Sequence, residues 1–415
     1  MNSDPSNAMT NREQRGIQIA AVARIERKGK VYYVPSVTSP RPTKYEVAVL
    51  SSGTTCNCPD FETRGLKCKH IYAVECVIQR ESSTDAAGVT TVTESVRITK
   101  TRKTYPQDWP AYNEAQMNEK RQFQILLADL CKCLPEPEVK PGRGRPSIPL
   151  ADAVFSVVFK VYSCFSGRRF TSDLCEAQAK GYISRVPHYN TSFKYIENPD
   201  LYPILMALIE RSALPLAAVE SDFAVDSTGF CYSRFVRWYD VKYGRFTHEQ
   251  QWIKTHLCTG VKTNIVTAVE IHGQASHDAN HLPALVGTTR KQFTMKEVSA
   301  DKAYSTQECH TSIEAAGAVP FIQFKKNATG GIGGLFEKML HYFRFRKDEF
   351  LAHYHQRSNA ETTMMMIKTK HGDGLRSKTE VAGRNEVLCK ILCHNLCVNI
   401  SAMYELGIQP AFNLV

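Results

Sequence analysis

Three cysteines and one histidine near the N-terminus limit the local fold more than any other residues in this sequence. Cys56 and Cys58 form a C-x-C pair, Cys68 and His70 form a C-x-H pair, and nine residues separate the two pairs. Three thiolates and one imidazole complete a tetrahedral zinc site of the structural type, with no ligand position left open for catalysis. The sequence therefore predicts one structural Zn²⁺ per chain, held in a small fold of its own.

The residues around these ligands predict strands before the site and a helix after it. Apolar and β-branched runs predict strands over 17–30, 31–36 and 44–50. A helix is expected to begin near Cys68. Its apolar side would carry Ile71, Val74 and Ile78. Cys76 lies outside the ligand pattern and is expected to pack on this helix.

This stretch resembles a SWIM zinc finger. Besides the four ligands, the likeness rests on the preceding strand, on CPDF at 58–61 and on RGLKCKHIYAV at 64–74. The resemblance implies a zinc-binding module that contacts DNA or a protein partner, and both kinds of partner stay open. We expect the finger to occupy residues 17–80.

Residues 81–110 are expected to form a linker, because SSTDAAG and a Thr-rich run carry no burial pattern. A basic patch follows, formed by Arg97, Lys100, Arg102 and Lys103. The patch fits either contact with phosphate or a solvated surface.

Residues 111–215 are predicted to be a helical DNA-binding region. A helix is expected over about 111–134, with one buried face formed by Phe123, Leu126, Leu127 and Leu130. A segment rich in Pro and Gly follows. Its RGRP at 143–146 fits both a hinge and the core of an AT-hook, whose arginines enter the minor groove. Further helices are expected over 151–165, 170–182 and 201–214.

From Leu216 onward, strand patterns alternate with helix patterns, which predicts an α/β domain with a mixed sheet over residues 216–405. Strands are expected over 216–230, 235–244, 251–256, 263–273, 293–305 and 319–326, and helices from about 278 and over 306–316. The last helix, over 384–406, carries Cys389, Cys393 and Cys397 beside His394. These four residues fit either a second metal site or close packing.

Two aspartates stand at the expected ends of strands in this domain. Asp226 ends AVD within SDFAVDSTGF, and Asp301 ends VSAD within MKEVSADKAYS. A single aspartate in such a place is often only a cap. Together with a third carboxylate, however, they would hold two Mg²⁺ ions about 4 Å apart, which activates a hydroxyl for attack on phosphorus.

The third carboxylate is found in the stretch 354–368. At 100° per residue, Tyr354, Arg357, Glu361 and Lys368 fall on one narrow helical face. Such a face suits a metal-binding carboxylate whose neighbours hold phosphate oxygens, with a bidentate Arg357 and a point charge at Lys368. An exposed amphipathic helix with ordinary i, i+4 pairs fits the same spacing.

The spacing Y-x2-R-x3-E-x6-K in this stretch resembles the signature of DDE transposases from bacterial and archaeal insertion sequences. DST at Asp226, SADKAY at Asp301 and HDAN at 277–280 resemble the upstream motifs of that family. Only 60 residues separate Asp301 from Glu361, too few for the β-rich insertion that some members place there.

The resemblance implies a ribonuclease-H-like catalytic fold and cut-and-paste chemistry at the ends of the element. The residues it implies as ligands of two catalytic Mg²⁺ or Mn²⁺ ions are Asp226, Asp301 and Glu361. The residues it implies as contacts to DNA phosphates are Tyr354, Arg357 and Lys368. Joining two element ends implies at least a dimer during the reaction. A DNA-binding regulator that no longer cuts and a nuclease that cuts without joining are the alternatives.

The overall charge agrees with a DNA partner. Lys and Arg number 52 against 41 Asp and Glu, a net charge of +11 that favours a polyanion. No uninterrupted apolar run approaches the roughly 18 residues needed to cross a bilayer, and the N-terminus has no apolar signal region. We therefore expect a cytoplasmic, prokaryotic protein with no membrane partner. The 14 cysteines are then metal ligands or core residues rather than disulfides.

Overall fold

The computed structural model describes residues 11–36, 43–50, 53–84, 90–98, 108–135, 148–232, 252–273, 276–325, 327–331 and 333–412. The chain divides into two compact units, Met1–Pro106 and Gln107–Val415. Each unit is described below by itself.

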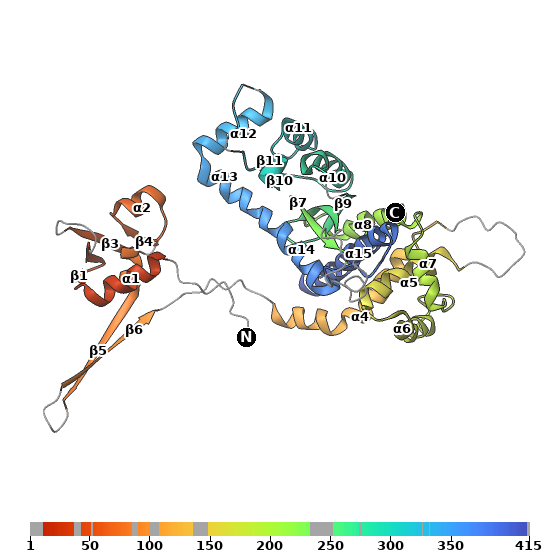
Figure 1. The fold of residues 1–415 in the computed structure, drawn as a ribbon, viewed down its shortest axis with the longest axis horizontal. Helices are drawn as coiled ribbons and strands as arrows, with labels where there is room; N and C mark the ends of the chain where they lie inside the picture. Colours follow the sequence, from red (N-terminus) through yellow and green to blue (C-terminus); the bar gives the residue numbers. More distant parts are fainter. Residues whose placement is uncertain are drawn as a thin grey trace, which may run out of the picture. The chain divides into compact units, whose positions relative to one another are not determined.

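The N-terminal unit is a small antiparallel sheet covered by short helices (Figure 1). Its elements are α1 (Asn11–Val22), β1 (Glu26–Lys28), β2 (Val31–Pro35), β3 (Lys44–Leu50), β4 (Gly53–Cys56), α2 (Pro59–Arg64) and α3 (Lys69–Glu75). The strands follow the order β1-β2-β3-β4. Val34 and Val47 of the sheet and Ile71 of α3 are fully buried and form the core of the unit. The strands expected over 31–36 and 44–50 are confirmed.

The strand expected over 17–30 is wrong, because this segment begins as helix α1 and becomes strand β1 only at Glu26. Helix packing explains the difference. A Cβ on Gly16 would lie 2.5 Å from the Cβ of Tyr72, so the missing side chain lets α1 approach α3 closely. Ile19 and Ala20 are buried in the same core, and their burial stabilises the helix over the strand.

Helix α3 also ends earlier than expected, since residues 76–84 form a strand. Strand β5 (Cys76–Thr84) pairs antiparallel with β6 (Thr90–Ile98), so Ile78 lies in β5 rather than on the helix. This hairpin extends into the segment expected as a linker, because residues 81–84 and 90–98 lie in its strands. Arg97 of the basic patch lies in β6, whereas Lys100, Arg102 and Lys103 lie outside the described residues.

The C-terminal unit begins with a helical bundle. Its helices are α4 (Trp109–Cys131), α5 (Leu150–Ser163), α6 (Gly167–Ala179), α7 (Tyr189–Ile196) and α8 (Leu201–Ala213). The buried face expected on the first of them is confirmed, because all four of its apolar residues are buried: Phe123, Leu126, Leu127 and Leu130. The Phe123 ring stacks on that of Tyr162 in α5, with ring centroids 3.8 Å apart. The RGRP segment lies outside the described residues.

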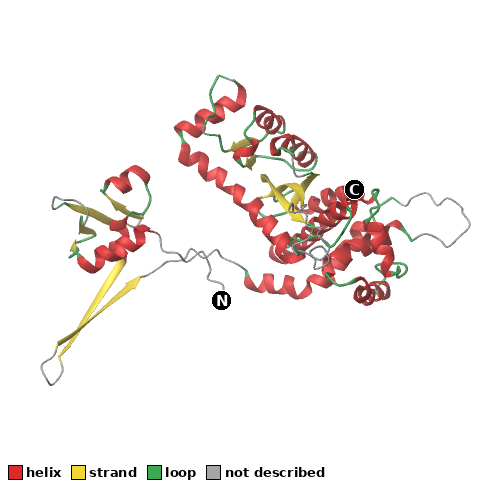
Figure 2. Ribbon diagram, in the orientation of Figure 1, coloured by secondary structure: helices red, strands yellow, loops and turns green. Residues whose placement is uncertain are grey.

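A five-stranded mixed sheet follows the bundle (Figure 2). Its strands are β7 (Asp222–Cys231), β8 (Trp252–Gly260), β9 (Val266–His272), β10 (Glu297–Ala300) and β11 (Val319–Ile322). The order is β11-β10-β7-β8-β9, and β8 runs in the direction opposite to the other four strands. The expected ribonuclease-H-like mixed sheet is thereby confirmed. The strand expected over 235–244 lies outside the described residues.

Helices cover both faces of this sheet. On one face α10 (Leu282–Thr289) and α11 (Gln307–Ala315) pack against alternate residues of β7 such as Phe223 and Val225. On the other face lie α8, α14 (Ser358–His371) and α15 (Glu380–Glu405). Two more helices, α12 (Gly334–Phe345) and α13 (Lys347–Tyr354), pack beside β11 with Phe321.

Helix α15 is the central helix of the C-terminal unit. By length and composition alone it is apolar enough to cross a membrane, but 78% of its apolar window is buried inside the protein. Cys389 and Cys393 are fully buried, and the His394 side chain meets the Asn264 carbonyl oxygen at 2.8 Å. Among the described residues, no metal-ligand group forms on this helix, so these residues serve packing.

A buried carboxylate joins the start of β7 to the turn after β8. Glu220 is 2% exposed and accepts hydrogen bonds from the backbone N–H groups of Lys262 and Thr263, at 3.2 and 2.5 Å. A Cβ on Gly260 would lie 2.4 Å from the Glu220 carboxyl carbon. Only glycine therefore fits at this position without moving the carboxylate.

Candidate active site and zinc finger

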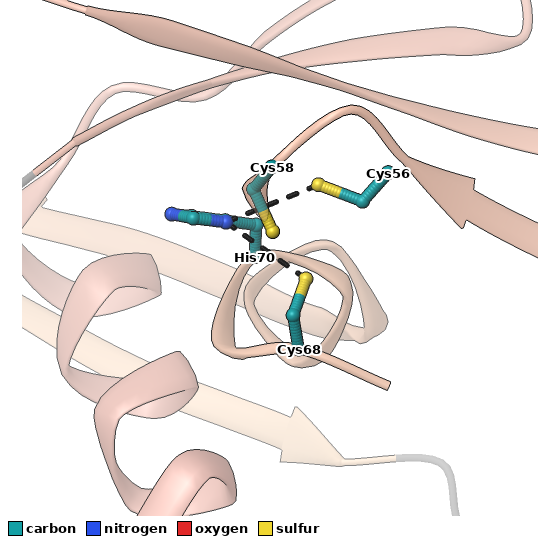
Figure 3. A group of neighbouring side chains, drawn as sticks. All are labelled: Cys56, Cys58, Cys68 and His70. Atoms are coloured by element: carbon teal, nitrogen blue, oxygen red, sulfur yellow. Dashed lines mark hydrogen bonds between the residues drawn. The ribbon is translucent and has the colours of Figure 1, made fainter. Parts of the chain in front are cut away.

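The four expected zinc ligands converge on one point of the N-terminal unit (Figure 3). Cys56 ends β4, Cys58 and Cys68 are the N-cap residues of α2 and α3, and His70 lies in the first turn of α3. All four are buried, and their ligand atoms lie within 4.8 Å of one another. The His70 Nδ1 atom lies 3.9 Å from the Cys56 Sγ and 3.8 Å from the Cys68 Sγ.

These distances fit a tetrahedral zinc ion. With Zn–S bonds of about 2.3 Å and Zn–N bonds of about 2.1 Å, neighbouring ligand atoms of a tetrahedron lie about 3.5–3.8 Å apart. Without a metal ion, ionisation of one thiol opposes ionisation of another. A hydrogen bond from Cys56 lowers the pKa of Cys68 to about 3, and the same bond raises the pKa of Cys56. Burial raises the pKa of Cys58. A dication removes this opposition because it stabilises all the thiolates together.

The two expected catalytic aspartates lie on neighbouring parallel strands. Val225 of β7 pairs with Ala300 of β10, so Asp226 and Asp301, each the next residue along the chain, lie side by side. Asp301 follows the end of its strand as expected, whereas β7 continues past Asp226 to Cys231. The strand is longer because β8 pairs with β7 up to Cys231.

Arg357 connects the third carboxylate to the first. Its guanidinium lies 2.6 Å from the Asp226 Oδ2 and 2.5 Å from the Glu361 Oε1. The Asp226 and Arg357 side chains are only 16% and 19% exposed, whereas Glu361 is 58% exposed. One cation therefore holds two carboxylates, one from the sheet and one from helix α14.

The charge state of Asp226 follows from this arrangement. Burial raises its pKa, and the charges of Asp301 and Glu361 raise it further. The Ser227 backbone N–H, which donates to Oδ1 at 2.8 Å, and the Arg357 charge both lower it. The pKa of Asp226 is raised overall. The positive charge of Arg357 therefore does not compensate for burial and for the two neighbouring carboxylates in the free protein.

The stretch 354–368 is not the single α-helix that was expected, because the chain leaves the α-helix between Tyr354 and Ser358. Tyr354 ends α13, a 3₁₀ turn spans His355–Arg357, and α14 starts at Ser358. The four residues of the Y-x2-R-x3-E-x6-K spacing still lie on consecutive elements of one helical run (Figure 1). Tyr354 is close enough to Asp301 and Arg357 for both to shift its pKa, which burial raises.

An open cavity of about 570 Å³ lies beside these carboxylates. Its lining residues are Asp226, Ser227, Thr228, Glu361, Met364, Met365, Lys368, Thr369 and Asp373. Lys368 is the one lysine among these lining residues, and its Nζ lies 5.4 Å from the Phe230 ring centroid. Thr228, Thr369 and Asp373 were not expected from the sequence. Only Thr228 had a signal, since it belongs to the DST motif.

Three other described residues that could approach DNA, Trp252, Lys254 and Lys325, do not line this cavity. Lys254 forms an ion pair with Asp278 and donates to the Ser276 carbonyl oxygen at 3.0 Å, so its side chain is only 15% exposed. Trp252 packs over Gly229, where a Cβ would lie 2.7 Å from the indole ring. Lys325 is exposed, and Lys326 lies outside the described residues.

Comparison with known families gives one match in each unit of the chain. Residues 218–396 match the family model of the transposase DDE domain, and residues 45–75 match that of the SWIM zinc finger. The chain therefore carries a transposase DDE domain and an N-terminal SWIM zinc finger, which supports a transposase-family function on DNA and zinc binding by the finger. Searches of curated proteins and of solved structures found no match.

Proposed function

We propose that this protein is a transposase that cuts DNA at the ends of a mobile element and joins those ends to target DNA. The observation that carries the proposal is the placing of Asp226 and Asp301 on neighbouring parallel strands, with Glu361 held to Asp226 through Arg357. Three carboxylates offer oxygen ligands only, the donor set that Mg²⁺ prefers. We propose Asp226, Asp301 and Glu361 as the ligands of two Mg²⁺ ions.

The chemistry needs little from other side chains. Bound Mg²⁺ would supply nucleophile activation and stabilise the oxygen that leaves phosphorus. The protein orients the ligands: Ser227 N–H fixes one oxygen of Asp226, and the sheet register fixes Asp301 beside it. Water would attack first and free a 3′-hydroxyl at the element end, and that hydroxyl would then attack target DNA in the same site. Tyr354, Arg357 and Lys368 would position the DNA phosphates.

We further propose that Cys56, Cys58, Cys68 and His70 hold one structural Zn²⁺, and that the helical bundle of residues 111–215 contributes to DNA binding. The separate steps of cutting two ends and joining them favour a dimer in the synaptic complex. The chain would act in the prokaryotic cytoplasm, where DNA is directly accessible.

The test uses the full chain, Mg²⁺ and a DNA fragment that carries the element ends. Wild-type protein should give excised and inserted products. Asp226→Asn, Asp301→Asn and Glu361→Gln should each abolish both products while DNA binding persists. The matched control is Glu349→Gln, since Glu349 is 58% exposed and pairs only with Arg346 among the described residues.

The outcomes separate the alternatives. Normal activity in any of the three carboxylate variants removes that residue from the site. Cleavage without joining by wild-type protein supports the nuclease, and DNA binding with neither product supports the regulator that no longer cuts.

A further inference from the structure

A second group of metal-ligating side chains lies in the C-terminal unit, away from the carboxylates. Glu270 and His272 lie on β9, and His281 lies at the start of α10. One ligand atom from each lies within 4.8 Å of the other two. The His272 and His281 rings stack with centroids 3.7 Å apart, and the His272 Nε2 lies 3.0 Å from the Glu270 Oε2.

The group lies on the opposite face of the sheet from Asp226. Successive residues of a strand point to opposite faces. Asp226 pairs with Leu257, whereas Ser227 pairs with His256, and His256 in turn pairs with Glu270. Glu270 therefore shares the face of Ser227 and not that of Asp226. The two groups cannot bind the same ion.

A buried histidine beside the group has an unused nitrogen. His256 is fully buried, and its ring centroid lies 4.6 Å from that of His281. Its Nδ1 lies 3.2 Å from the Tyr304 hydroxyl, whereas its Nε2 has no hydrogen-bond partner among the described residues. A buried ring nitrogen without a partner costs free energy, which a cation or an ordered ligand at this place would offset.

The chemistry of the group suits a divalent cation. Two imidazoles close to one carboxylate form a donor set of nitrogen and oxygen. Among the described residues, Lys254 near the group is paired with Asp278.

We propose that Glu270, His272 and His281 bind a divalent transition-metal ion, with Zn²⁺ as the expected occupant. Two imidazoles and one carboxylate are a common ligand set for this ion and leave a further position for water. Glu270 and His272 are 29% and 34% exposed, so the ion reaches the group from solvent. Bound there, it ties β9 to the start of α10.

The histidines around the proposed site also reach the turn that follows Asp301. Tyr304, which meets His256, belongs to the 3₁₀ turn Lys302–Tyr304 directly after Asp301. The ion would therefore stabilise the face of the sheet behind the catalytic carboxylates. It is a structural site, additional to the zinc finger and independent of the proposed reaction.

Zinc bound per chain is the direct test, measured on the full protein after dialysis against buffer that contains a slight excess of Zn²⁺ and no other transition metal, followed by gel filtration. Wild-type protein should retain two zinc ions. Cys68→Ser should retain one, His272→Ala should retain one, and the double variant none. His277→Ala is the matched control, because His277 is an exposed histidine near the group and should leave two.

Cobalt distinguishes the two ions by their ligands. Only the finger supplies thiolates, so the charge-transfer absorption of thiolate-bound Co²⁺ should vanish in Cys68→Ser and persist in His272→Ala. Wild-type protein that retains a single zinc ion, or His272→Ala that retains two, would overturn the proposal. If His272→Ala does not fold, the isosteric Glu270→Gln replaces it, with loss of one zinc again expected. Asp226→Asn should keep both ions, which excludes the carboxylate site as their source.

Discussion

Arg357 offers the sharpest test of how the carboxylate site works, because it holds Asp226 and Glu361 before any metal enters. The bond to Asp226 joins two mostly buried charged groups at 2.6 Å, a contact of about 1.5–3 kcal/mol. The i, i+4 bond to the exposed Glu361 adds only about 0.3–0.5 kcal/mol. Arg357→Gln removes both bonds and should lower the free energy of unfolding of the metal-free protein by about 2 kcal/mol.

The same bonds oppose metal binding. A Mg²⁺ ion that takes the Asp226 and Glu361 oxygens must displace the guanidinium, so the energy of those bonds is subtracted from metal affinity. Since about 1.4 kcal/mol corresponds to a tenfold change, Arg357→Gln should bind Mg²⁺ roughly 10- to 30-fold more tightly than wild-type protein. Binding of element-end DNA should weaken instead, because one phosphate contact is lost.

Titration calorimetry of Mg²⁺ into the zinc-loaded protein measures the first effect, and a DNA-binding titration at fixed salt measures the second. Arg384→Gln is the matched control, since Arg384 forms an exposed i, i+4 pair with Glu380 at 2.7 Å, outside the site. Unchanged or weaker Mg²⁺ binding in Arg357→Gln would show that the guanidinium and the metal do not compete for the same oxygens.

Three further predictions concern separate parts of the chain. Because the pKa of Asp226 is raised in the folded protein, stability is lost as the pH rises through that pKa. Metal-free Asp226→Asn should therefore lose less unfolding free energy than wild type as the pH rises above the ordinary aspartate pKa of 3.8, in urea titrations at each pH. Cys68→Ser should release one zinc ion per chain, whereas Cys76→Ser should release none, by elemental analysis. Gly260→Ala should lower the unfolding free energy by about 1–3 kcal/mol, as measured by urea unfolding. Gly273→Ala is the control, because an added Cβ there meets nothing within 4 Å, and it should lower the unfolding free energy by less than about 1 kcal/mol.

The sequence predicted best what depends on short spacing. Cys56, Cys58, Cys68 and His70 lie within fourteen residues of one another, so their convergence needs only one loop and the start of one helix. The burial of Phe123 and its neighbours likewise follows from a helical period. The pairing of Asp226 with Asp301 is different, because β7 and β10 are joined by an edge hairpin and a helix. No local pattern predicts that pairing, and only the family resemblance suggested it.

The break between α13 and α14 shows why local patterns fail there. The segment YHQRS contains neither proline nor glycine, so nothing in it predicts an end to the helix. Tertiary contacts set the break instead. His353 bonds Glu297 at 2.9 Å and stacks on Phe321, which fixes the end of α13 on the sheet. Arg357 is drawn to Asp226 on a different strand, which fixes the start of α14. The 3₁₀ turn connects these two positions.

The charges around Arg357 predict the order in which Mg²⁺ and DNA bind at the carboxylate site. Among the described residues, the free site holds three carboxylates against the guanidinium of Arg357 and the ammonium of Lys368, so a DNA phosphate that enters first meets net negative charge. Two Mg²⁺ ions would reverse that sign and release Arg357 from the carboxylates. The released guanidinium then becomes a phosphate ligand, at the moment when a phosphate can be accommodated. Metal binding should therefore precede close approach of the scissile phosphate, and DNA held by the rest of the protein should contact Arg357 only when Mg²⁺ is present.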